Sequence, residues 1–259
     1  MKKIKRILSS LLVAVMILSA VPLGQLAGLD LGLEAMAASD SIILEVPRLR
    51  QRGGDGCGGC CYLSSLASVK AYALGTYKGV TYKIGKDYDH SDPVHKMCVK
   101  ENGDKAYVYY APFRRMGFSF KFGQAMNQKT MREIYNSLAK GRPVVIYCAS
   151  GSKRSPHASV IIGYSGSTDT FSMDNFCVME INASVGLNKN WNSFKTNSYV
   201  QFDKGKLVSS CYVSLSKWIK GRGKTDIVYY NGEIKRNIVP TKPTITKNTS
   251  NDISVNDTV

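Results

Sequence analysis

The chain has 259 residues, 44% of them hydrophobic, and carries 35 Lys and Arg against 19 Asp and Glu, for a net charge of +16. This length provides one sizeable core and is too short for two once the polar termini are set aside. The positive charge comes without a dense Lys/Arg stripe or a recognition motif, which argues against a nucleic-acid-binding protein.

Residues 1–37 have the pattern of a secretory signal peptide. A basic start (KKIKR) precedes a short apolar run (LLVAVMIL), and Ala35–Ala37 offers a small-x-small cleavage site. Pro22 and Gly24 follow the run and disfavour the alternative, a permanent membrane anchor. We therefore expect a mature chain from about Ala38 that works outside the cytoplasm, either secreted or associated with the cell envelope.

The mature chain keeps 31 basic and 17 acidic residues, a net charge of +14, because residues 1–37 contain four basic and two acidic ones. This charge either attracts anionic cell-wall polymers or lipid headgroups, or only supports solubility. We expect one domain over residues 41–235. The segment 236–259 is rich in Thr, Asn and Pro, lacks core-forming residues, and is predicted to be a flexible polar tail or linker.

The first half of the domain contains the clearer helix signals. SIILEV (41–46) predicts a strand, and residues 60–74 place apolar side chains at helical spacing, with Gly75 as the stop. The segment 77–104 is polar without a clear period, so His90 and His95 are expected to be solvated loop residues. Two segments that alternate like short strands follow, at residues 107–110 and 118–122.

The second half favours strands. Asn127 is expected to cap a helix whose apolar face ends before Gly141. Strands are predicted at residues 143–148, 157–164, 176–181 and 208–213, with a last one from Asp226. Helices first and strands afterwards indicate an α+β domain.

A thiol-rich helix start and a distant histidine carry the chemistry. Cys57, Cys60 and Cys61 lie where the helix begins, and His157 opens the apolar strand HASVIIGY. A helix dipole stabilises a thiolate at its N-terminus, and an adjacent imidazole completes an ion pair that is nucleophilic at neutral pH. Seven cysteines also leave at least one unpaired, although Cys98, Cys148, Cys177 and Cys211 lie in or near apolar stretches typical of core thiols.

The order VPRLRQ, a Cys-led helix, GRPVVIY, HASVIIGY and FCVMEIN resembles the papain-like peptidases that remove double-glycine (bacteriocin) leader peptides, in particular their secreted, stand-alone relatives. The likeness spans about residues 45–182. It implies a papain-like fold, with the Cys helix packed on an antiparallel sheet that carries the His and the Asn. It also implies a bacterial source and a peptide or protein substrate.

The same resemblance assigns roles by position. Gln51 matches the glutamine that donates to the oxyanion, beside the backbone N–H of the nucleophile. Cys61 is favoured as the nucleophile because Ser65, Leu66 and Ala67 follow it in the family's register.

Two other cysteines remain alternatives for the nucleophile. Cys57 has the family's usual spacing from Gln51 and precedes a glycine, and Cys60 fits a CGxC pattern. The CxxCC cluster also admits a metal site, but no second cluster supplies the remaining ligands, so we expect neither a metal nor a cofactor.

His157 is expected to take the thiol proton and return it to the leaving amine. Asn182 matches the position that orients the imidazole, although the family's following proline is Ala183 here. Glu180 lies on the same strand face and is the alternative.

Three functions remain open at this level. The first is a cysteine peptidase that hydrolyses peptide bonds with a Cys-His-Asn triad. The same Cys–His pair also suits acyl transfer, in a transpeptidase or a deamidase. A catalytically inactive envelope-binding or adhesion module, with its cysteines in disulfides, is the third.

Overall fold

The computed structural model describes residues 41–51, 60–103, 108–149, 151, 156–182, 193–197 and 211–236. The expected signal peptide, the tail beyond Arg236 and Cys57 lie outside these residues, so the corresponding predictions are not tested. Cys60 is described by its backbone alone. No helix in the described part of the chain is long and apolar enough to cross a membrane.

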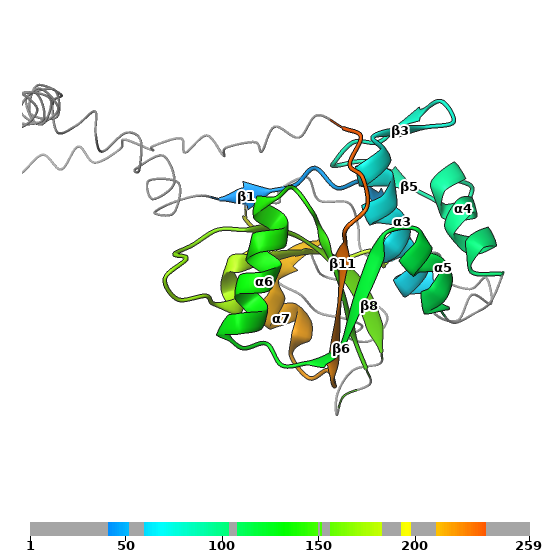
Figure 1. Cartoon of the computed structure of the whole chain (residues 1–259). Helices are drawn as coiled ribbons and strands as arrows, with labels where there is room; N and C mark the ends of the chain where they lie inside the picture. The colour runs from blue at the N-terminus through cyan, green and yellow to red at the C-terminus, as the bar shows by residue number, and fades with distance from the viewer. Residues whose placement is uncertain are drawn as a thin grey trace, which may run out of the picture.

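Short helices and a mostly antiparallel sheet make up the domain, in agreement with the predicted α+β class (Figure 1). In chain order the elements are β1 (Ile42–Ile43), β2 (Arg48–Leu49), α3 (Cys60–Leu74), β3 (Thr76–Tyr77), β4 (Val80–Thr81), β5 (Asp87–Tyr88), α4 (Pro93–Glu101), α5 (Tyr110–Arg115), β6 (Phe118–Gln124), α6 (Gln128–Ala139), β7 (Val144–Cys148), β8 (His157–Tyr164), the 3-10 turn η1 (Met173–Asn175), β9 (Phe176–Met179), β10 (Tyr212–Ser214), α7 (Leu215–Ile219) and β11 (Thr225–Tyr230).

The main sheet has the order β10-β9-β8-β7-β11-β6, and β1 pairs with the end of β8. All of these pairs are antiparallel. The last strand in the sequence, β11, lies between β7 and β6. Residues from both ends of the domain are therefore needed to build the sheet.

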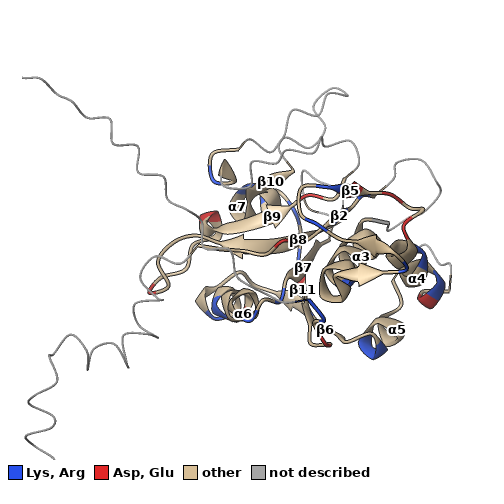
Figure 2. Ribbon diagram, turned by 90° about the horizontal axis from the view of Figure 1, so that it is seen from above, with Lys and Arg blue, Asp and Glu red and all other residues tan. Residues whose placement is uncertain are grey.

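The helices divide into two groups. Figures 1 and 2 place α3, α4 and α5 together on one side of the molecule and α6 away from them. Both α3 and α6 contact β7 and β8. The α3 helix also packs on α4, so it lies between the sheet and the outer helix.

The α3 helix is buried on nearly all sides rather than on one stripe. Leu63, Leu66 and Ser68 are each at most 1% exposed. Helices of this kind must satisfy their polar groups internally. Ser68 Oγ accepts a hydrogen bond from the backbone N–H of Leu49 at 3.0 Å, and Ser65 Oγ donates to the carbonyl of Cys61 at 2.8 Å.

Two local predictions were wrong. The segment 77–104 contains α4, and His95 on this helix is only 2% exposed, against the expected solvated loop residue. The expected strand 107–110 is absent where the structure describes it, since Tyr110 begins the short helix α5. His95 is buried by contacts with distant segments, which the local sequence pattern does not reveal. The aromatic residues of the segment 107–110 favour a strand by propensity, which explains the second error.

Candidate active site

Cys61 lies in the first turn of the buried helix α3. It is the second helical residue, and its side chain is 8% exposed. Backbone N–H groups in a first turn have no partner within the helix, and the positive end of the helix dipole lies there. A negative charge on the sulfur, or on an oxygen beside it, is stabilised at this point.

His157 is the first residue of β8 and is 4% exposed. Its imidazole is hydrogen-bonded to the side chain of Cys61, and its Nε2 lies 2.6 Å from Oε1 of Glu180. Since Nε2 faces the carboxylate, Nδ1 is left for the sulfur. The contact between α3 and β8 brings together two residues that are far apart in the sequence.

Glu180 follows directly after β9 and is 1% exposed. Besides His157, its Oε1 accepts a hydrogen bond from the backbone N–H of Asn182 at 2.9 Å. The indole N–H of Trp218 donates to Oε2 at 3.0 Å. Hydrogen-bond donors of this kind favour the ionised form of a buried carboxylate.

Burial alone lowers the pKa of His157, because it disfavours the charged imidazolium. The negative charge of Glu180 opposes this, as do the hydrogen bonds to Cys61 and Glu180. Together they raise the pKa of His157 to about 9. The imidazole in this environment is therefore protonated at neutral pH, as a partner for a thiolate must be.

Gln51 and Asn182 belong to the same neighbourhood through their backbones. The two residues form an isolated parallel bridge, and the N–H of Gln51 donates to the carbonyl of Ile181 at 2.8 Å. The amide oxygen of Gln51 is buried and has no hydrogen-bond partner among the described residues. The roles assigned to these two side chains stay predictions.

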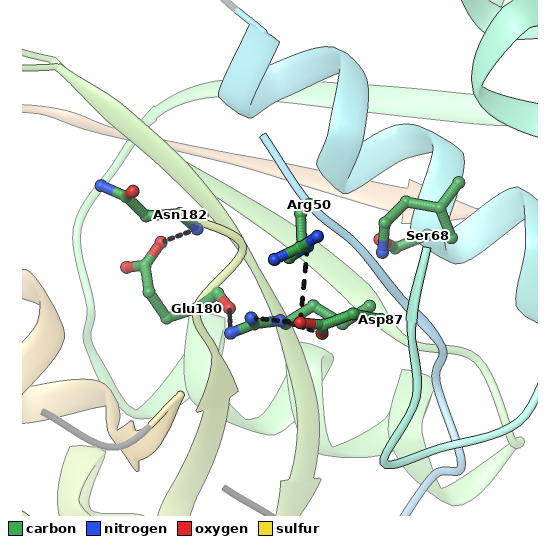
Figure 3. A network of polar contacts seen from close by, with 7 residues as sticks. Arg50, Ser68, Asp87, Glu180 and Asn182 are labelled. Carbon is green, nitrogen blue, oxygen red and sulfur yellow. Dashed lines mark hydrogen bonds and ion pairs between the residues drawn. The ribbon is translucent and has the colours of Figure 1, made fainter. Parts of the chain in front are cut away.

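An ion-pair network braces the segment that carries Glu180. Arg48, 1% exposed, donates from Nε and Nη2 to the two carboxylate oxygens of Asp87 at 2.7 and 2.9 Å, and from Nη1 to the carbonyl of Glu180 at 3.3 Å. Nε of Arg50 lies 3.4 Å from Oδ2 of Asp87. Figure 3 shows Arg50 and Asp87 beside the segment that runs from Glu180 to Asn182.

The other described cysteines have a different character from Cys61. Cys98, Cys148, Cys177 and Cys211 are completely buried and free of disulfides, as is expected for core thiols. Burial raises the pKa of Cys148, and it raises that of Cys98 to about 12. Among the described residues, no group of three or more His, Cys, Asp or Glu has the arrangement of a metal site.

Three contributors to this cluster were not predicted from the sequence. Trp218 donates to the Glu180 carboxylate, Arg48 donates to its carbonyl, and Asp87 pairs with Arg48, all through contacts between distant segments. The motif VPRLRQ places Arg48 close to Gln51 in the sequence, but it does not indicate that Arg48 pairs with Asp87. The Glu180 carboxylate is the group bonded to His157, whereas the sequence favoured Asn182 for that role.

Comparison with known protein families shows to which family the chain belongs. The model of the Peptidase_C39 like family matches residues 43–210, which is more than half of the chain. No curated protein matches the chain in a sequence search. The matched region contains Gln51, Cys61, His157, Glu180 and Asn182. The α+β fold of the domain is consistent with that of papain-like cysteine peptidases. Because the match covers more than half of its length, the chain belongs to the Peptidase_C39 like family.

Proposed function

We propose that this protein is a secreted cysteine peptidase that hydrolyses peptide bonds in peptide or protein substrates through an acyl-enzyme. The observation that carries the proposal is the continuous chain of hydrogen bonds from Cys61 through His157 to Glu180. All three groups are nearly buried, so water competes little with the ion pair.

In the first step, the Cys61 thiolate attacks the carbonyl carbon of the scissile bond. Negative charge moves to the carbonyl oxygen, which the backbone N–H of Cys61 and the side-chain amide of Gln51 are proposed to stabilise. The protonated His157 then donates its proton to the leaving amine, and the C–N bond breaks. The products are an acyl-enzyme thioester and a free amine.

In the second step, neutral His157 removes a proton from water, which attacks the thioester. The tetrahedral intermediate collapses with release of the carboxylate product, and the thiolate–imidazolium pair forms again. Throughout, Glu180 fixes which ring nitrogen faces the sulfur, because its carboxylate holds Nε2.

The extracellular location rests on the signal-peptide pattern of residues 1–37, and attraction to anionic wall polymers rests on the net charge of the mature chain alone.

Thiol labelling of the folded, secreted protein tests the proposal. Iodoacetamide at pH 6 is expected to modify Cys61 first, because the buried Cys98, Cys148, Cys177 and Cys211 are shielded. Peptide mass spectrometry then maps the modified residue. Replacing His157 with Ala is expected to slow labelling about tenfold or more, because the thiolate loses its imidazolium partner.

His90→Ala is the matched control, since His90 precedes the outer helix α4 and stacks on His95 of that helix. Labelling and hydrolysis of a peptide library should be unchanged in this variant. Labelling of Cys57 or Cys60 would assign the role of nucleophile to that cysteine instead of Cys61. Resistance of all three cysteines would contradict the peptidase and favour a binding module, whereas an amide product formed only with added amine would favour acyl transfer.

A further inference from the structure

We propose that Trp218 is a positioning residue for the Cys61–His157 pair: its indole N–H holds the Glu180 carboxylate in the ionised form, so that the proton shared by Glu180 and His157 stays on the imidazole. This inference rests on the proposed peptidase function. It concerns a residue that acts through Glu180, to which its indole N–H donates.

The geometry divides the two carboxylate oxygens between different donors. Oε1 faces Nε2 of His157 at 2.6 Å and accepts from the N–H of Asn182, whereas Oε2 accepts from Nε1 of Trp218 at 3.0 Å. Trp218 is fully buried, and its ring lies 6.0 Å from the imidazole at an interplanar angle of 29°. The indole therefore both donates to the carboxylate and keeps water from this side of the pair.

The indole is itself held firmly. Trp218 belongs to α7, which packs against β9 and β10. The guanidinium of Arg222 lies 4.4 Å from the centre of the indole ring, and its Nε donates to the carbonyl of Trp218 at 2.9 Å. Trp218 also lies beyond residue 210, where the match to the family model ends. The C-terminal segment thus supplies a part of the site that the family match does not include.

The physical role follows from a choice between two arrangements of one proton. In the first, Glu180 is a carboxylate and His157 an imidazolium; in the second, both are neutral. Burial favours the neutral pair, because it avoids two desolvated charges. Hydrogen bonds to a carboxylate favour the charged pair, because they are stronger to an anion than to a neutral acid. Only the charged pair provides Cys61 with a cation.

Two substitutions at position 218 test the inference. Trp218→Phe removes the N–H donor, and 3-benzothienylalanine at the same position replaces N–H by sulfur while keeping the shape of the indole. The rate of iodoacetamide labelling of Cys61 is measured at pH 6 and at pH 9.5. We expect about a tenfold loss at pH 6 in both variants, the value of a hydrogen bond to a charged group. At pH 9.5 most of the imidazolium has already lost its proton, so the rate no longer depends on the indole N–H and should stay within about twofold.

Tyr82→Phe is the matched control, because Tyr82 is a buried aromatic residue whose O–H donates to the carboxylate of Asp92 at 2.9 Å, away from the site. Its labelling rates should be unchanged at both pH values. An equal loss at the two pH values in the Trp218 variants, or no loss at all, overturns the inference. Failure of the unmodified protein to label at Cys61, or labelling that does not depend on His157, is a different result and overturns the proposed function instead.

Discussion

At the scale of single residues, Glu180 and Asn182 offer His157 different chemistry. Glu180 presents a buried carboxylate to the imidazole, and Asn182 contributes its backbone N–H to that carboxylate. A side-chain substitution at Asn182 keeps this N–H. We expect Glu180→Gln to lower kcat by about 10²-fold or more, and Asn182→Ala by less than about tenfold. Steady-state kinetics on one peptide substrate compares the two variants, and the reverse order would restore Asn182 as the orienting residue.

Gln51 has a distinct expected signature. Its proposed role begins only when charge develops on the substrate oxygen, so Gln51→Ala should lower kcat by about 10²- to 10³-fold with little change in KM. Alkylation by iodoacetamide forms no oxyanion, and its rate at Cys61 should therefore remain unchanged. A parallel loss of both rates would mean that Gln51 acts on the thiol or on the fold, and would exclude the oxyanion role.

At the scale of elements, two helix caps differ in burial and so in expected cost. The side chain of Asn127 accepts from the N–H of Thr130 at the start of α6, near the surface. Asp92 caps α4, is 6% exposed, and also accepts from the O–H of Tyr82.

We expect Asn127→Ala to lower the free energy of unfolding by about 1 kcal/mol. Asp92→Ala should cost about 2 kcal/mol or more, because it also leaves the buried Tyr82 hydroxyl without its carboxylate acceptor. Denaturant unfolding of the two variants measures the difference. Equal losses would show that the Tyr82 hydroxyl finds another partner.

Local signals explain which elements the sequence predicted. The α6 helix carries its cap and its stop in adjacent residues, since Asn127 caps it and Gly141 follows in the left-handed region at φ 69°. The α4 helix was missed because its buried side chains, His95 among them, are polar or widely spaced and become core only against α3. The site follows the same rule. Cys61 and His157 had local patterns, whereas the bond between Trp218 and Glu180 joins residues 38 positions apart.

At the scale of the whole molecule, two buried histidines are expected to shape the pH dependence of stability. The pKa of His157 is raised from 6.5 to about 9. Its contribution to the free energy of unfolding is therefore complete below pH 6.5 and is lost as the pH rises through 9. Burial, together with the neighbouring His90, lowers the pKa of His95 from 6.5 to about 4. Its contribution is complete above pH 6.5 and is lost as the pH falls towards 4.

Unfolding by urea at pH 4.5, 6.5 and 9 measures this profile. His157→Gln should flatten the alkaline side of the curve and leave the acidic side unchanged, while His95→Gln should flatten only the acidic side. If neither substitution alters the shape of the curve, other titrating groups control it and the ion pair contributes little to folding.

The position of β11 sets an order of events for the newly made chain. This strand is the last in the sequence, yet it lies between β7 and β6 and joins them. Until the residues up to Tyr230 have left the ribosome, β6 has no partner strand in the sheet, and Trp218 emerges only shortly before them. The thiol and its imidazole therefore reach their working arrangement only after nearly the entire domain has been synthesised, so a partly made chain does not yet have a complete site.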